Sequence, residues 1–241
     1  MKNWFLRKMI LAGLVLLLVA VAAPAETQDF NGPDAGTVVS GNDTGGSIVP
    51  GTLFPGFTLS VQNDGNGPHT IIIFDSADPT GGDPDLGTPN QSCGGPGVGW
   101  GGQAGEPGEN CVARGNLIII AEDVVDSNGD GLVDDPDDEA GGGLVTFAFN
   151  ELVDLESIVV IDIDTNESVD YQVYLEGSLV GSGSGQNLGN NSVQTLDLSA
   201  HEGIDTLEIV FSGSGAIAEL SWSESQTAVE HIGLSRLKSQ Y

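Results

Sequence analysis

Short runs of alternating apolar and polar residues recur along most of the chain. Successive side chains of a strand point to opposite faces, so each run is expected to form a strand with one buried face. The apolar positions of these runs are Phe57, Leu59, Val61; Val145, Phe147, Phe149; Val159, Ile161, Ile163; Tyr171, Val173, Leu175; Leu196, Leu198; Leu207, Ile209, Phe211; and Ala216, Ala218, Leu220, Trp222. The pattern predicts a protein built mainly from strands.

Two further runs, Ile71–Phe74 and Leu117–Ile120, are apolar at every position and rich in β-branched residues. Strands of this kind are usually covered on both faces. We expect these two strands to lie at the centre of the core.

Turn-forming clusters such as residues 63–68 and the Gly-Ser repeat at residues 181–185 separate the runs, and no stretch keeps a helical period. Many short strands divided by such turns favour an all-β fold. We predict a two-sheet antiparallel sandwich over residues 26–225, jelly-roll-like (galactose-binding-like), with nine or ten strands.

The first 25 residues have the features of a secretory signal peptide: basic residues, an apolar run at residues 9–23, and a small-x-small site before Glu26. The alternative is a membrane anchor, but 15 apolar residues are fewer than the roughly 20 needed to span a bilayer. We therefore expect a secreted, extracellular, cell-surface or periplasmic protein with no stable membrane span after cleavage. Residues 226–241 show no strand pattern and are predicted to form a flexible tail.

The chain has 35 Asp and Glu against 6 Lys and Arg among 241 residues, a formal charge of −29. Removal of residues 1–25 leaves only Arg114, Arg236 and Lys238 as basic residues. A protein with so few basic side chains cannot neutralise a phosphate backbone or dock on anionic lipid. Nucleic acid is therefore excluded as an ordinary partner. Cations are the expected partners.

Cys93 and Cys111 are the only cysteines. In an oxidising compartment they are expected to form a disulfide, which stabilises a loop of this size by about 3 kcal/mol in the chain-entropy model. The alternative is a pair of free thiols kept for metal binding or catalysis.

Residues 126–137 carry the ligand order of a 12-residue calcium loop. Counted from Asp126, oxygen-bearing side chains occupy positions 1, 3, 5, 9 and 12, Gly131 occupies position 6, and the Leu132 carbonyl is available at position 7. The side-chain ligands are Asp126, Asn128, Asp130, Asp134 and Asp137. The loop resembles those of EF-hands and dockerin repeats, but strands rather than helices flank it. We predict a static Ca²⁺ site; the alternative is a solvated acidic loop with no specific ion.

A second acidic cluster follows the apolar run at residues 71–74. It contains four carboxylates between proline and glycine residues that restrict the backbone, namely Asp75, Asp78, Asp83 and Asp85. The chemistry suits a second calcium site, although no spaced motif supports it.

Four segments of the sequence resemble a group of exported bacterial β-sandwich proteins of unassigned function. They are residues 73–90, 116–123, 140–143 and 212–220. Members of this group often carry a C-terminal PEP-CTERM sorting anchor. The resemblance implies a secreted or surface β-sandwich and no established activity. The tail of this chain lacks the Pro-Glu-Pro motif, the apolar helix and the basic end, so anchoring by that route is not supported.

The three histidines are scattered and show no zinc or catalytic-triad spacing, so we do not expect an enzyme. Trp100 lies in a glycine-rich segment between the cysteines and is the candidate ligand contact, because sugars stack on exposed aromatic rings. We predict a calcium-binding module with a binding or extracellular-matrix role. The alternatives are a carbohydrate-binding module with structural calcium and a purely structural surface or biofilm component.

Overall fold

The computed structural model describes residues 24–41 and 51–225. Nearly all of the predicted signal peptide and the whole predicted tail lie outside these ranges. The elements are β1 (Glu26–Gln28), β2 (Val38–Ser40), β3 (Phe57–Asn63), β4 (Ile71–Asp75), the 3₁₀ turns η1 (Pro84–Leu86) and η2 (Gln91–Cys93), β5 (Asn116–Ile120), β6 (Gly143–Ile161), β7 (Val169–Leu175), β8 (Ser178–Ser184), β9 (Val193–Asp197), β10 (Ile204–Phe211) and β11 (Ala216–Glu224). Within the described ranges, no helix has the length and apolar character needed to cross a membrane.

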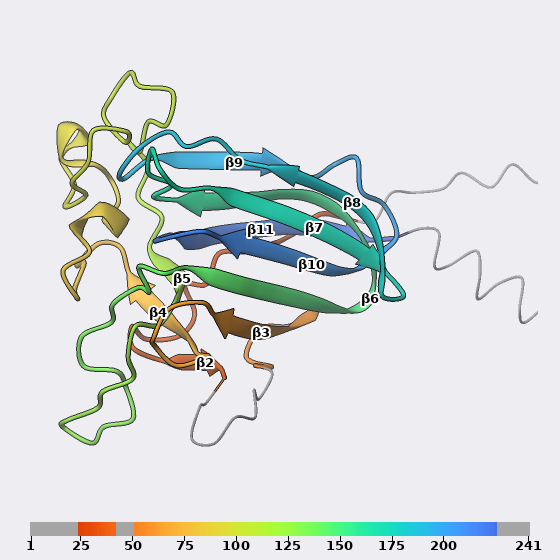
Figure 1. Ribbon diagram of the computed structural model, residues 1–241, viewed down its shortest axis with the longest axis horizontal. Coiled ribbons are helices and arrows are strands. Elements are labelled where there is room, and N and C mark those ends of the chain that lie inside the picture. Colours follow the sequence, from red (N-terminus) through yellow and green to blue (C-terminus); the bar gives the residue numbers. More distant parts are fainter. Residues whose placement is uncertain (1–23, 42–50, 226–241) are drawn as a thin grey trace, which may run out of the picture.

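The strands form two antiparallel layers that share the long strand β6 (Figure 1). The first half of β6 pairs with β3 and β10, and β7 and β8 continue that layer. The second half of β6 pairs with β9 and β11, and β5, β4 and β2 continue the other layer, with β1 added to the end of β11. The predicted all-β sandwich is confirmed, with eleven strands rather than nine or ten.

The shared strand β6 joins two of the predicted runs and changes the phase of its buried residues. Opposite β11, Trp222 pairs with Leu155 and Ser221 with Ser157, so Glu156 is an extra residue that forms a bulge. After the bulge, Ile158 and Val160 face the inter-sheet core, while Val159 and Ile161 face outward and are also buried. The prediction of one buried face was therefore wrong for this half of the strand.

A second apolar layer on the outer face of the β4–β5 sheet explains why both faces are buried. All residues of the runs 71–74 and 117–120 are at most 3 % exposed, as predicted. Odd and even positions of β4 belong to different clusters, with Ile71 and Ile73 between the sheets and Ile72 and Phe74 in the outer layer. Leu86 and Val133 come from the two long acidic loops and belong to the outer layer. The acidic loops are therefore packed onto the sheet through apolar residues.

The Gly-Ser repeat at residues 181–185 was predicted to be a turn, and this prediction was wrong, because most of it lies in β8. The reason is tertiary. A Cβ atom on Gly181 would lie 2.5 Å from the His201 ring, and one on Gly183 would lie 2.6 Å from the Tyr171 ring. Rings from neighbouring segments fill the space that side chains of β8 would occupy, so glycine is needed at these strand positions.

The segment between the cysteines docks closely on residues 188–191. A Cβ atom on Gly101 would lie 2.5 Å from the backbone oxygens of Leu188 and Gly189. We expect Gly101→Ala to lower the free energy of unfolding by about 1 to 3 kcal/mol, the usual cost of forced overpacking, measured by urea denaturation. Gly32→Ala is the matched control, since nothing lies within 4 Å of its Cβ position. Equal stability of the two variants would contradict the close docking.

Candidate metal centre

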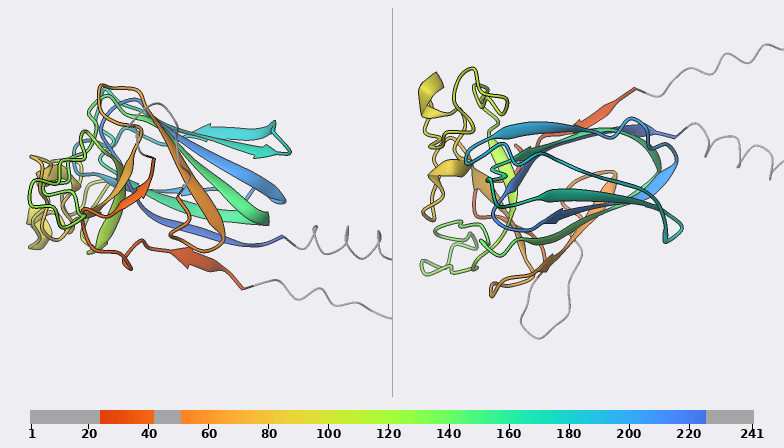
Figure 2. Two further views of the ribbon diagram at one scale, coloured as in Figure 1. Left: turned by 90° about the horizontal axis from the view of Figure 1, so that it is seen from below. Right: turned by 45° about the horizontal axis from the view of Figure 1, so that its top comes forward.

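The two acidic segments, residues 75–85 and residues 126–138, lie side by side at one end of the sandwich, where the long loops gather in both views of Figure 2. Three hydrogen bonds of 2.9 Å join them: Thr80 Oγ1 to Pro136 O, Gly81 N to Asp135 Oδ1, and Asp138 N to Asp83 Oδ2. The structure thus brings together the two clusters that were predicted as separate sites.

Backbone amides organise the loop that begins at Asp126. The two carboxylate oxygens of Asp126 accept hydrogen bonds from the amides of Gly129 (2.7 Å), Asp130 (3.2 Å) and Gly131 (2.9 Å). Gly131 has a φ of 91°, in the left-handed region that a glycine adopts at no steric cost. The tight turn expected at position 6 of the loop is present.

The other predicted ligands of this loop converge on the same turn. Asn128 Nδ2 donates to Asp134 Oδ1 at 2.9 Å, and the amide of Ser127 donates to Asp134 Oδ2 at 2.6 Å. Asp130 Oδ1 accepts from the amide of Leu132 at 2.9 Å. Asp126, Asn128, Asp130 and Asp134 therefore share one turn, and all of them are exposed to solvent.

An open cleft of about 270 Å³ connects this loop to the first acidic segment. Asp75 and Asp78 line one side, and Asn128, Asp130 and Asp134 line the other. Half of the predicted second cluster therefore faces the first loop.

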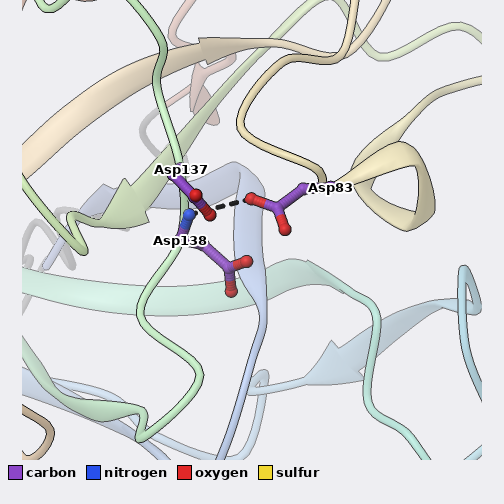
Figure 3. A group of neighbouring side chains, drawn as sticks. All are labelled: Asp83, Asp137 and Asp138. Carbon is purple, nitrogen blue, oxygen red and sulfur yellow. Dashed lines mark hydrogen bonds between the residues drawn. The ribbon is translucent and has the colours of Figure 1, made fainter.

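Asp137, the twelfth position of the predicted loop, belongs to a different group. Its carboxylate lies with those of Asp83 and Asp138, each offering an oxygen within 4.8 Å of the others (Figure 3). Asp137 and Asp83 are partly buried, and Asp138 is only 5 % exposed. This is a second, deeper grouping of carboxylates beneath the loops.

The deep group continues into the sandwich through Ser214. Its hydroxyl lies 2.7 Å from Asp138 Oδ2 and 3.2 Å from Asp162 Oδ2, and Asp162 is 2 % exposed. One hydroxyl has one hydrogen and can donate to only one of two carboxylates. Protonation of one carboxyl group, or a nearby cation, would reduce the repulsion between the two carboxylates that face this hydroxyl.

The electrostatics of the deep group agree with this geometry. Burial, followed by the charge of Asp138, raises the pKa of Asp83 to about 9. Burial also raises the pKa of Asp138 to about 6. Burial and the charge of Asp85 raise the pKa of Asp162 to about 7. Burial and mutual repulsion therefore favour the protonated forms of these carboxyl groups.

Glu139, directly after Asp138, shows what a satisfied carboxylate looks like in this fold. Burial disfavours its charge, but hydrogen bonds from the amides of Gly141 and Gly67 and from Asn63 Nδ2 outweigh burial and hold its pKa below the ordinary value. Its carboxylate joins the turn at residues 63–68 to the turn that follows Glu139. Asp83, Asp138 and Asp162 lack a comparable excess of donors.

Asp138, Asp162 and Ser214 lie outside the predicted ligand sets. Asp162 directly follows the apolar end of β6 and has a φ of 66°, which is unusual for a residue with a side chain. An acidic residue directly after a buried strand is the one local signal that pointed to it. Asp85 Oδ2 accepts a hydrogen bond from Asn190 at 3.0 Å, and burial raises its pKa.

The donors in both groupings are oxygens from carboxylates, with an amide oxygen from Asn128. Hard cations such as Ca²⁺ and Mg²⁺ prefer oxygen donors, whereas Zn²⁺ sites are built mainly from histidine and cysteine. Arg114 is the only lysine or arginine in the described ranges. The donor set therefore fits calcium.

The remaining predicted site residues lie in the neighbouring loop. Cys93 and Cys111 form the predicted disulfide, with their Cα atoms 5.3 Å apart. Trp100 is 53 % exposed, and its indole lies so close to Gly189 that a Cβ atom there would be 2.4 Å from the ring. The ring is thus fixed on one side and open to solvent on another.

No family model and no curated protein matches the chain. Among solved structures, the chain is similar to the crystal structure of the F5/8 type C domain of a protein from Bacteroides fragilis, with 13 % sequence identity and a TM-score of 0.27. The similar part covers 36 % of this chain and 68 % of that domain. A likeness of this extent carries no functional argument.

Proposed function

We propose that the protein is an exported calcium-binding β-sandwich module with a binding or matrix role outside the cell. The observation that carries the proposal is the deep group of carboxylates, in which Asp138 and Asp162 are almost fully buried and share one serine hydroxyl. Burying unpaired carboxylates costs several kcal/mol, and such charges are usually paired or coordinate a metal ion.

We propose two calcium positions. The exposed position uses Asp126, Asn128, Asp130, Asp134 and the Leu132 carbonyl, with Asp75 and Asp78 across the cleft. The deeper position uses Asp83, Asp137 and Asp138, with Asp85 nearby. Both positions draw on both acidic segments, so each ion would tie the segments together over the outer apolar layer.

Export would bring the two calcium positions into a compartment where calcium is available. Extracellular calcium modules bind at about 10⁻⁴ to 10⁻³ M, so the ions would bind after secretion and hold the loops in place. An ion that binds only the folded state stabilises it by RT ln(1 + [Ca]/Kd). The bound ions would make the loop end of the sandwich rigid enough to present a binding surface.

We infer binding rather than catalysis because the histidines within the described ranges already have structural partners. His69 Nδ1 accepts a hydrogen bond from the amide of Asn63 at 2.9 Å. The His201 ring packs edge-on against Tyr171 with centroids 5.6 Å apart. The second candidate function, a carbohydrate-binding module supported by calcium, is favoured by the exposed Trp100.

The test is a thermal melt of the purified protein in EDTA and across a calcium titration, with magnesium as the control ion. At a calcium concentration of roughly fifty times Kd, each site adds about 2 kcal/mol, which raises Tm by about 5 to 10 °C. The double variant Asp126→Ala/Asp130→Ala should lose only the part of the calcium-induced rise in Tm that comes from the exposed site. Identical melts of the wild type in EDTA and in calcium would refute the proposal.

A further inference from the structure

A groove of about 510 Å³ lies on the open side of the sandwich, between β7 and β8 of one layer and β9 of the other. β8 and β9 are edge strands of their layers and lie on the same side of the molecule in Figure 1. The groove is separate from the acidic loops described above. Its size falls within the range of small-ligand sites, about 300 to 1,000 Å³.

Glycine residues in β8 leave room for the aromatic rings beside the groove. Gly181 and Gly183 leave room for the rings of His201 and Tyr171, and a Cβ atom on Gly185 would lie 2.8 Å from Gln194 Oε1. Tyr171 is half-buried and packs against the core, with its hydroxyl 3.4 Å from His201 Nε2. An aromatic ring therefore lines the groove while remaining attached to the core.

The walls combine apolar contacts with fixed polar groups. Leu188 and Pro107 supply apolar surface. The side chain of Gln194 is held in place by the backbone of Gln186, since Gln194 Oε1 accepts from the Gln186 amide at 2.8 Å and Gln194 Nε2 donates to the Gln186 carbonyl. A carboxamide has two N–H donors and two acceptor positions, so one of each remains for a ligand.

The loop between the cysteines contributes one residue to the groove wall and a nearby aromatic ring. Pro107 of this loop lines the groove directly, and Trp100 of the same loop lies against Gly189, the neighbour of Leu188. Trp100 is half exposed, although tryptophan side chains are usually largely buried in a protein that has no binding partner. The exposed indole therefore lies against Gly189, next to the groove wall at Leu188, while Tyr171 and Gln194 line the groove itself.

We propose that this groove binds a neutral oligosaccharide. A sugar has an apolar face that stacks on aromatic rings and hydroxyl groups that pair with amides and carboxylates, which matches this lining. Asp197 at the groove and a net charge of −29 oppose anionic glycans. The inference rests on the proposed binding role, but it does not depend on the calcium sites.

The test uses the whole protein in calcium buffer, in affinity electrophoresis and on an array of neutral glycans (β-glucan, mannan, xylan and galactan), with polygalacturonate and heparin as anionic probes. We expect retention by at least one neutral glycan and by neither anionic one. Trp100→Ala and Gln194→Ala, which remove the exposed indole and the fixed carboxamide, should each weaken binding at least fivefold. Tyr174→Ala is the matched control. Tyr174 lies on β7 three residues after Tyr171, but it does not line the groove, and its hydroxyl donates to Gln172, which also lies outside the groove.

Each outcome decides the proposal. Retention by no neutral glycan, retention by the anionic probes instead, or equal binding by wild type and both groove variants would overturn it. Calcium-dependent melting is measured on the same samples. A calcium response without glycan binding would remove the groove proposal alone, and glycan binding without a calcium response would remove the metal proposal alone.

Discussion

Replacing Asp83 and Asp138 together by asparagine is expected to raise Tm in EDTA by about 5 to 15 °C and to remove the calcium response of the deeper site. Asparagine keeps the shape and the acceptor oxygen that Asp138 offers to Ser214 and Gly215, but it cannot ionise. The buried carboxyl groups cost roughly 2 to 5 kcal/mol near neutral pH, and at this chain length 1 kcal/mol corresponds to about 2 to 4 °C.

The measurement is a calorimetric melt of wild type and variant in EDTA and in 5 mM calcium. Asp29→Asn/Asp64→Asn is the matched control, since it makes the same change in charge at two exposed positions. A variant that is less stable than wild type in EDTA, and still responds fully to calcium, would show that the deeper carboxylates carry no ionic cost and bind no ion.

Raising the pH from 5 to 8 in EDTA is expected to destabilise the protein, the reverse of ordinary acid denaturation. Asp162 has a folded-state pKa of about 7, above the ordinary value of 3.8. The folded state therefore holds this proton more tightly than the unfolded chain does. The resulting stability is present at low pH and is lost as pH rises from about 4 through 7.

Between pH 5 and 8 the expected loss from Asp162 alone is about 3 kcal/mol, and the raised pKa values of Asp138 and Asp83 act in the same direction. The measurement is urea denaturation at a fixed, moderate salt concentration across this pH range. Asp162→Asn should make the loss of stability smaller by the share that Asp162 contributes. In calcium the profile should also flatten, because the cation offsets the negative charges that otherwise hold protons. A stability that rises with pH in EDTA would contradict the prediction.

Patterns of apolar and polar residues predicted much of the fold, because strand formation and tight turns depend mainly on residues that are close in sequence. Alternation predicted most of the strands, and the apolar runs of β4 and β5 predicted burial on both faces, which their exposure of at most 3 % confirms. The pairing of the two cysteines followed from the expected compartment. The close-range hydrogen bonds of the Asp126 turn span only two to seven residues, so residue spacing was enough to anticipate that turn.

Contacts between distant segments decided the rest. Asp137 was assigned to the nearest loop, but a hydrogen bond across 55 residues draws the adjacent Asp138 to Asp83, so Asp137 lies in the deeper group. Asp162 and Asp138 meet at Ser214 across separations of 52 and 76 residues. No local pattern encodes such a meeting.

The Gly-Ser repeat of β8 shows the same limit most clearly. Taken by itself, a glycine-rich segment favours a turn, because glycine has a high entropy cost in a strand and packs no side chain. Here the rings of Tyr171 and His201 occupy the space beside the strand, and glycine is the residue that fits. Local residue patterns were enough to predict the strand content, the buried runs and the oxygen-rich loops. Which carboxylates share a site, and where the sandwich stays open, depends on which distant surfaces come into contact, and no local pattern specifies that.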